Sequence, residues 1–256
     1  MLQKPRGQIA IRSAREVELI RAASRIVAEV LAAASDWVKP GVATAELDRR
    51  AEELMRARGA TPSFKGYLGY PAAICVAINE QVVHGIPGDR VLAEGDIVGI
   101  DVGAYKNGYH GDAARTYAVG EVAPEARHLM EVGAESLARA IAAARVGNYV
   151  GDIGYAVQSY CEKAGYSVVR DLVGHGIGER LHEDPQVPNY GRRGTGMPLQ
   201  AGMVLAIEPM VNAGDWRVVT LADRWTVVTA DRSLSVHFEN TVAVTENGPD
   251  ILTRIE

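Results

Sequence analysis

Apolar residues recur along this chain with two different periods, and each change of period marks the boundary of an expected element. Ser13 and Glu16 have the spacing of a capping box and precede apolar residues at helical spacing, which predicts a helix to about Val38. Pro40-Gly41 breaks this helix, and a second amphipathic stretch ends at Gly59. The chain is therefore expected to open with two helices.

Strand-type patterns follow the two helices, and the same order then repeats. From about Ser63 to Val119 the apolar runs are short and punctuated by glycine. Pro124 begins an alanine-rich helix expected to extend to Ala144, a shorter helix ends at Gly165, and strand-type runs return after it. This repeated order of two helices and several strands predicts an α+β fold.

Two short motifs also occur twice. Val83-His84-Gly85-Ile86 resembles Gly174-His175-Gly176-Ile177, and the apolar run that ends at Asp101 resembles the run that ends at Glu208. In both copies a histidine precedes an acid at the end of an apolar run. These repeats indicate two related halves.

The halves are not separated by a Pro/Ser-rich or charged linker. We therefore predict a single domain over residues 1–256, with pseudo-symmetric halves of about 11–121 and 122–256. Acids that face each other from the two halves would converge on a central site.

One pair of acids flanks a strong hairpin signal. Asp101 ends a buried-type strand, and Tyr105-Lys106-Asn107-Gly108 is a turn sequence. A turn centred between Lys106 and Asn107 would place Asp101 directly across from Asp112. Two carboxylates in that position repel each other unless a proton or a cation lies between them, which indicates a metal site.

Further acids interrupt apolar runs in the second half, namely Glu208 and Glu239. Any one such acid alone is better explained as an exposed strand residue or a salt-bridge partner. Four of them together, two in the repeated motif, make that explanation weak because buried acids are uncommon unless paired or metal-bound. Together with His175 they form a donor set of oxygen and nitrogen that suits Mn, Fe, Co or Zn.

The remaining histidines divide into two groups by their sequence context. His84 lies in a glycine-flanked turn and His182 follows His175 within one loop, so both can reach into a cleft. His182-Glu183-Asp184-Pro185-Gln186 is not a zinc HExxH helix, because glutamine takes the second histidine position. We interpret the others as surface residues or as supports behind the site: His110, His128 and His237.

Composition excludes several classes of partner. A net charge of −5 and a pI near 5.7 provide no general attraction to nucleic acid or anionic lipid. The two cysteines, Cys75 and Cys161, suit a reducing compartment, and there is no signal-peptide core or spanning apolar run. We expect a cytoplasmic protein with no membrane contact and no specific DNA binding.

From about residue 11 onward the chain resembles the bacterial type I methionine aminopeptidases. The likeness rests on specific motifs: Asn79-Glu80, His84-Gly85-Ile86-Pro87, Gly99-Ile100-Asp101, Gly111-Asp112, Gly174-His175-Gly176-Ile177-Gly178, His182-Glu183, Ile207-Glu208-Pro209 and Phe238-Glu239. It implies a pita-bread fold, in which an antiparallel sheet is covered by helices, and a dinuclear centre of Co, Mn, Fe or Zn. By this resemblance the metal ligands are Asp101, Asp112, His175, Glu208 and Glu239.

The same resemblance assigns roles around the metals. His84 and His182 contact the substrate, and Glu208 acts as the base. The methionine pocket would be formed by Phe64, Tyr67, Tyr70, Cys75, Leu181 and Trp225. A monovalent cation would lie at Asn79, Gln81 and Ser235. The chain departs from common family residues at Phe64, Leu68, Leu181, Arg224 and Asn240, which bears on pocket shape and metal affinity.

The implied activity is cotranslational removal of N-terminal methionine from nascent polypeptides, with a small second residue favoured. We expect transient association with the ribosome and a monomeric enzyme. One alternative is an Xaa-Pro aminopeptidase with an almost identical metal cage, which the length of 256 residues disfavours. Another is a non-catalytic binding protein of the same fold, which the complete ligand set disfavours.

Overall fold

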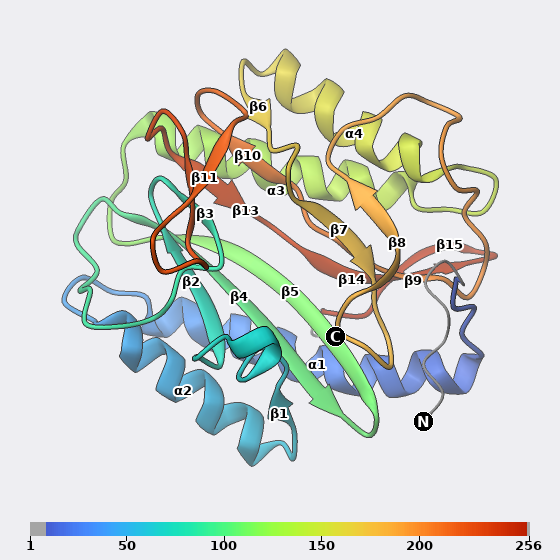
Figure 1. Cartoon of the computed structure of the whole chain (residues 1–256), viewed down its shortest axis with the longest axis horizontal. Helices are drawn as coiled ribbons and strands as arrows, with labels where there is room; N and C mark the ends of the chain where they lie inside the picture. Colours follow the sequence, from blue (N-terminus) through green and yellow to red (C-terminus); the bar gives the residue numbers. More distant parts are fainter. Residues whose placement is uncertain (1–8, 255–256) are drawn as a thin grey trace.

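The computed structural model describes residues 9–254, and it begins with the two predicted helices. Helix α1 (Ala14–Trp37) starts at the predicted capping box, in which Ser13 and Glu16 satisfy each other's backbone N–H groups. Helix α2 (Thr44–Ala57) ends just before Gly59, whose φ of +69° suits glycine. Both predicted helices are thus confirmed, and Figure 1 shows them side by side along one edge of the molecule.

The first sheet packs against α1. It is antiparallel, and its strand order is β1-β4-β2 with β5 paired to β4. Apolar side chains from α1, α2 and these strands form one continuous core. The strands are β1 (Thr61–Pro62), β2 (Ile74–Ile78), β4 (Ile97–Lys106) and β5 (Tyr109–Ala118), and a short 3₁₀ turn, η1 (Tyr67–Gly69), precedes β2.

The β4–β5 hairpin has a different register from the one predicted. Its turn is Asn107-Gly108, with φ values of 52° and 88°, so its centre lies one residue later than expected. Asp101 therefore pairs with Ala114, and Asp112 pairs with Gly103. The prediction that Asp101 lies directly opposite Asp112 is wrong, because both positive φ values fall on Asn107 and Gly108. The two acids still share one face of the hairpin, as diagonal neighbours.

The second half contains the other two predicted helices and a five-stranded antiparallel sheet of order β15-β14-β9-β7-β8. Helix α3 (Pro124–Ala143) has Pro124 in its first turn, and α4 (Val150–Lys163) follows it. A second apolar core joins these helices to the sheet. The strands are β7 (Val173–Gly176), β8 (Glu183–Pro188), β9 (Val204–Ile207), β14 (Asn240–Thr245) and β15 (Gly248–Ile251).

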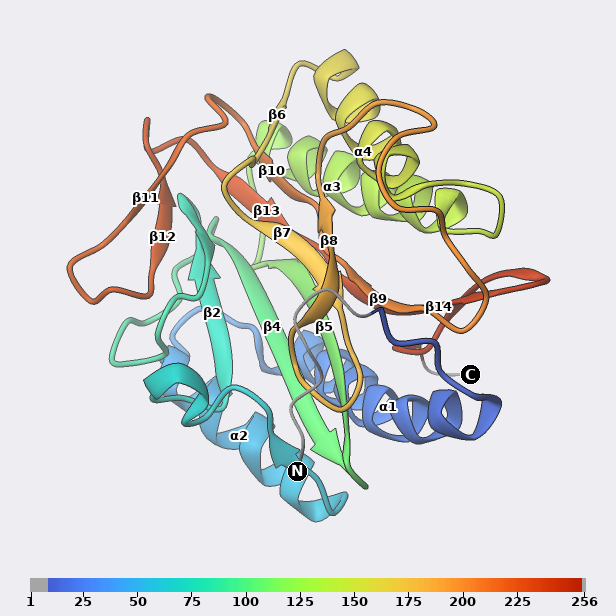
Figure 2. The same ribbon diagram turned by 45° about the vertical axis from the view of Figure 1, so that its right-hand side comes forward.

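Two three-stranded sheets complete the fold, with orders β13-β10-β6 and β11-β12-β3. Their strands are β3 (Gln81–Val83), β6 (Ser167–Val168), β10 (Met210–Asn212), β11 (Val218–Thr220), β12 (Val227–Thr229) and β13 (Ser235–His237). Figure 2 shows how β4, β5 and β13 run across the middle, between the helix pair α1–α2 and the helix pair α3–α4.

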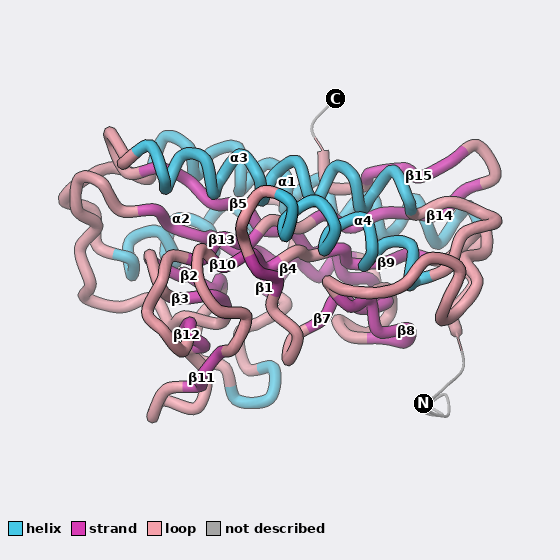
Figure 3. Tube along the Cα trace, turned by 90° about the horizontal axis from the view of Figure 1, so that it is seen from above, coloured by secondary structure: helices cyan, strands magenta, loops and turns pink. Residues whose placement is uncertain are grey.

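The helices and the short hairpins lie on different sides of the strands. Seen from above in Figure 3, α1, α3 and α4 lie on one side, whereas β7–β8 and β11–β12 project from the other. This arrangement matches the predicted α+β class, an antiparallel sheet covered by helices. The division into one domain with two pseudo-symmetric halves stays a prediction. Within residues 9–254, no helix combines the length and the apolar character needed to cross a membrane.

Candidate metal centre

A cavity of about 160 Å³ brings together all side chains predicted for the metals, for catalysis and for the methionine pocket. A larger, open depression between α3 and α4 has a single acid, Asp152, in its lining and offers no comparable donor set. The small cavity is therefore the candidate site. Its lining is Phe64, Tyr67, Leu68, Tyr70, Cys75, His84, Asp101, Asp112, His175, Leu181, His182, Glu208, Trp225 and Glu239.

The five predicted ligands come from different strands that meet at this cavity. Asp101 lies in β4, Asp112 in β5 and His175 in β7. Glu208 directly follows β9, and Glu239 lies between β13 and β14. The β4–β5 hairpin and the five-stranded sheet thus each contribute part of the predicted ligand set.

Two hydrogen-bonded links hold the hairpin against the second sheet at this point. Thr241 Oγ1 donates to the backbone oxygen of Asp112 at 2.7 Å and accepts from its N–H at 3.0 Å. The backbone N–H of Glu239 donates to the oxygen of Ala114 at 3.0 Å. Asp112 and Glu239 are therefore fixed at the junction of the two sheets by backbone contacts, which leaves their carboxylates free to face the cavity.

Several donor atoms lie close together, and three of the carboxylate oxygens are buried without a hydrogen-bond partner among the described residues. One donor atom each from Asp112, His175 and Glu239 lie within 4.8 Å of one another, and His175 Nε2 is 3.5 Å from a Glu208 carboxylate oxygen. Within the described chain, Asp101 Oδ1, Asp112 Oδ1 and Glu239 Oε1 are buried with no hydrogen-bond partner. Buried carboxylate oxygens without partners are strongly unfavourable unless a proton or a cation binds them, and this donor set fits divalent metal ions.

Burial and mutual repulsion change the acid–base properties of the cluster. Burial raises the pKa of Glu208 to about 8 and that of Asp101 to about 7. Burial, together with neighbouring carboxylates, raises the pKa of Asp112 and of Glu239 well above the ordinary value. Burial lowers the pKa of His175 to about 3, which keeps its ring neutral and able to bind a metal.

Two further histidines face the same cavity. His84 has a φ of +58°, and burial lowers its pKa to about 4. The Nδ1 atom of His182 lies 2.7 Å from the hydroxyl of Tyr67, and its ring centroid is 4.3 Å from that of His175. Both line the cavity outside the close cluster of Asp112, His175 and Glu239, and their contact with a substrate stays a prediction.

His237 is closer to the chemistry than the sequence indicated. The sequence leaves a surface position and a place behind the site both open. The side chain is buried, with Nε2 3.7 Å from a Glu208 oxygen, so it lies behind the site. Its position two residues before Glu239, in an apolar strand, is the available sequence signal. His110 is half-buried in an adjoining cleft, and His128 is exposed.

Arg115 was not predicted and supports the site from behind. It donates to the backbone oxygen of Glu239 at 2.6 Å and to Oδ1 of Asn240 at 2.8 Å. Asn240, one of the departures from family pattern, also accepts from Thr253 at 2.9 Å. The amide side chain at this position therefore serves as an acceptor that helps hold the Glu239 backbone.

The apolar wall of the cavity contains the predicted methionine pocket. Tyr70 and Trp225 meet edge to face with ring centroids 5.0 Å apart, and Tyr70 donates to two backbone oxygens. Phe64, Cys75 and Leu181 are buried. Arg224 has a φ of +66°, a backbone conformation that glycine adopts without strain.

The three residues predicted to hold a monovalent cation lie near one another beside β3. The backbone N–H of Ser235 donates to the backbone oxygen of Asn79 at 2.9 Å, and Asn79 Oδ1 accepts from the Ile97 N–H at 3.0 Å. Gln81 Oε1 accepts from the Ile78 N–H at 2.8 Å. These side-chain oxygens already accept hydrogen bonds, and the cation assignment stays a prediction.

Comparison with known proteins identifies the class. The profile of metallopeptidase family M24 matches residues 18–246. A methionine aminopeptidase of Clostridium perfringens is 54% identical over 248 residues, which cover 97% of this chain and 100% of that protein. Methionine aminopeptidase 1 of Bacillus subtilis is 52% identical over 247 residues, with coverage of 96% and 100%. The chain belongs to metallopeptidase family M24.

Comparison with solved structures narrows the assignment of the chain within family M24. The methionine aminopeptidase of Thermotoga maritima superposes with a TM-score of 0.96 at 46% identity, covering 97% of this chain and 100% of that one. A prolidase of Pyrococcus furiosus gives 0.78 at 28% identity, covering 96% of this chain and 66% of that one. Within the family the chain stands with the type I bacterial methionine aminopeptidases, and its fold is the pita-bread fold that the motifs predicted.

Proposed function

We propose that this metallopeptidase removes the N-terminal methionine from nascent polypeptides in the cytoplasm, with a small second residue preferred. The supporting observation is the cavity itself, in which unpartnered buried carboxylates lie next to an apolar aromatic wall. The donor set suits divalent ions, and the wall suits an unbranched thioether side chain. The implied partners are the N-terminal segment of a nascent chain and, transiently, the ribosome.

The ligands that we propose for two divalent ions are Asp101, Asp112, His175, Glu208 and Glu239. Bound ions of Co, Mn, Fe or Zn would supply Lewis-acid polarisation and a lowered pKa for water. The protein's own part is to keep five donors together in a small cavity, with the two sheets joined beside Asp112 and Glu239.

Three side chains would then move protons or stabilise charge. Glu208 is the proposed base that takes the proton of the attacking water. His182 uses Nδ1 for its contact with Tyr67, which leaves Nε2 to stabilise the oxyanion of the intermediate. His84 assists the scissile nitrogen through a hydrogen bond, for which its lowered pKa keeps the ring neutral at pH 7.

The test is a cleavage screen with metal-free enzyme supplied in turn with Mn, Fe, Co and Zn. We expect free methionine to be released from Met-Ala-Ser with at least one metal. Preference for Xaa-Pro peptides would favour the alternative peptidase. A protein that retains no divalent ion and cleaves neither peptide would favour the non-catalytic alternative.

Replacing His84 by alanine should separate catalysis from metal binding. We expect kcat to fall about 100-fold, the scale of a lost general acid or base, while both metals remain bound. Steady-state kinetics and metal analysis of the same preparation measure the two effects. His128→Ala, at an exposed position on α3, is the matched control and should behave like the wild type. Loss of metal from His84→Ala would show that His84 is a ligand.

Metal uptake should release protons at neutral pH. In the metal-free site burial raises the pKa of Asp101 to about 7 and of Glu208 to about 8, so these carboxyls hold protons that a bound cation displaces. The apparent metal affinity should therefore rise as the pH increases from 6 to 8. Calorimetric titrations at pH 7 in two buffers of different ionisation enthalpy measure the release. Equal binding enthalpies in both buffers would contradict it.

A further inference from the structure

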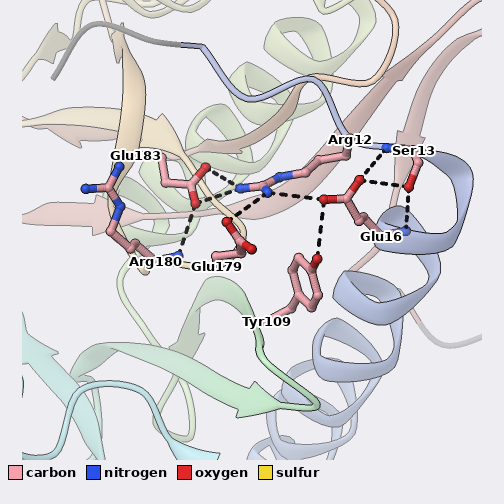
Figure 4. A network of polar contacts seen from close by, with 7 residues as sticks. All are labelled: Arg12, Ser13, Glu16, Tyr109, Glu179, Arg180 and Glu183. Atoms are coloured by element: carbon pink, nitrogen blue, oxygen red, sulfur yellow. Dashed lines mark hydrogen bonds and ion pairs between the residues drawn. The ribbon is translucent and has the colours of Figure 1, made fainter. Parts of the chain in front are cut away.

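The loop that carries His182 is held by an ion pair with a residue far away in the sequence. The loop, residues 177–182, connects β7 and β8, and Glu183 is the first residue of β8. Both Glu183 carboxylate oxygens accept from Nη2 of Arg12, at 2.7 and 2.6 Å. Figure 4 shows the Arg12 side chain reaching from the segment before α1 to this carboxylate.

This ion pair differs from the exposed pairs elsewhere on the molecule. Only 3% of the Arg12 side chain and 8% of the Glu183 side chain are exposed. Pairs on the surface contribute little, but a buried charge that loses its partner is strongly unfavourable. The Arg12–Glu183 pair is therefore able to fix a backbone position.

Arg12 is itself held from several directions. Its backbone N–H donates to the oxygen of Gly202 at 2.7 Å, and Nη1 lies 3.5 Å from a carboxylate oxygen of Glu16 and also of Glu179. Glu16 is fixed by the α1 capping box and accepts from the Tyr109 hydroxyl at 3.3 Å. Glu16 thus holds the guanidinium at the first turn of α1, and from this position the guanidinium contacts the loop.

The backbone of the loop leaves space for the guanidinium of Arg12. A Cβ atom at Gly178 would lie 2.3 Å from Arg12 Nη2, so only glycine permits this approach. Glu183 also accepts from the backbone N–H of Arg180 at 3.1 Å, which closes the turn between them. Leu181, within this closed turn, is buried in the apolar cluster that lines the cavity. His182 follows it directly.

We propose that Arg12 is a positioning residue, which sets the place of His182 and Leu181 in the active site through its ion pair with Glu183. The proposal rests on the proposed function of His182 as a residue that contacts the substrate. His182 itself is exposed and has only the Tyr67 hydroxyl as a hydrogen-bond partner among the described residues. The buried ion pair at the next residue in the chain therefore adds to the ring contacts with Tyr67 and His175 in fixing the position of His182.

The main test is Arg12→Met, which keeps an unbranched apolar stem and removes the charge. We expect kcat for Met-Ala-Ser to fall about 10- to 100-fold, the scale on which supporting residues and small misplacements act. KM should change by less than about threefold, and both metals should remain bound. Glu183→Gln should show a comparable loss, and Arg12→Lys a smaller one, because lysine keeps the charge without the planar fork.

A double-mutant cycle distinguishes positioning from a general structural role. In a His182→Ala background, Arg12→Met should have little further effect on kcat, because the residue through which it acts is already gone. Hydrogen exchange should also accelerate in residues 177–184 of Arg12→Met, but not in α2. The matched control is Arg21→Met, which removes an arginine of α1 that is also paired with an acid, Asp250 at 2.7 Å, and should leave both readouts unchanged.

The outcomes separate this proposal from the proposed function. If the wild type releases no methionine with any metal, the proposed function fails, and the hydrogen-exchange result decides whether Arg12 orders the loop. If the wild type is active and His182→Ala is slow, full kcat in folded Arg12→Met or Glu183→Gln overturns the positioning role. Additive losses in the double-mutant cycle also overturn it.

Discussion

Glu208→Gln is expected to reduce turnover of Met-Ala-Ser by about 1,000-fold or more. General acid–base catalysis contributes about 100- to 10,000-fold, and this glutamate is also a proposed metal ligand. Glutamine keeps the shape of the side chain but can neither accept the proton of the attacking water nor supply a negative charge to a cation. The measurement is single-turnover release of methionine at saturating metal, which separates chemistry from product release.

A matched Glu→Gln change elsewhere tests whether the loss is specific. Glu135 lies on α3 in an exposed i,i+4 pair with Arg139, and Glu135→Gln should retain wild-type turnover. Turnover within about threefold of wild type in Glu208→Gln would refute its role as the base. A slow variant that regains full rate at high metal concentration would instead show that Glu208 acts mainly as a ligand.

Asp112→Asn is expected to abolish metal-dependent activity while stabilising the metal-free protein. Asparagine lacks the negative charge of a proposed ligand. Loss of a residue that only supports a ligand lowers metal affinity by up to about 100-fold, so loss of a ligand should lower it by at least that factor. In the absence of metal, however, Asp112 is a buried carboxyl group with an unpartnered oxygen beside Asp101. Asparagine removes an ionisable group whose charged form is opposed by burial and by the neighbouring carboxylates, so the free energy of unfolding of the metal-free protein should rise by about 1–3 kcal/mol.

Asp48→Asn is the control for this pair of opposite effects. Asp48 is half-buried, and its Oδ1 accepts from the backbone N–H groups of Ala73 and Ile74 at 2.8 and 3.0 Å. Asparagine can accept the same bonds, so metal content and activity should be unchanged. Calorimetry with and without chelator measures both variants. Metal-free Asp112→Asn that is less stable than metal-free wild type would contradict the account of an unpartnered acid.

The acids that line the cavity could be picked out from the sequence because buried charge is costly. Acids such as Asp101 and Glu208 stand out at the ends of apolar runs, since a folded chain rarely retains them there without a cation or a partner. That reasoning is local and needs no knowledge of the tertiary structure. It identified residues that the structure gathers in one cavity. The helices were predictable for a similar reason, because the Ser13 capping box and Pro124 act within one turn.

The exact strand register and the supporting contacts were not predictable in the same way. The β4–β5 register depends on which two residues take positive φ, and a shift of one residue in the turn moved the partner of Asp101 from Asp112 to Ala114. Arg12 and Arg115 bond with residues 171 and 124 positions away, respectively. No periodic pattern connects residues so distant, so their roles emerge only when the sheets are assembled.

The most direct test of the central claim is anomalous diffraction from crystals of the protein loaded with manganese or cobalt. The account predicts two strong peaks in the cavity, both within coordination distance of the five proposed ligands and neither bound to His84. A single peak, a peak bound by His84, or occupancy confined to another part of the molecule would contradict the two-metal centre.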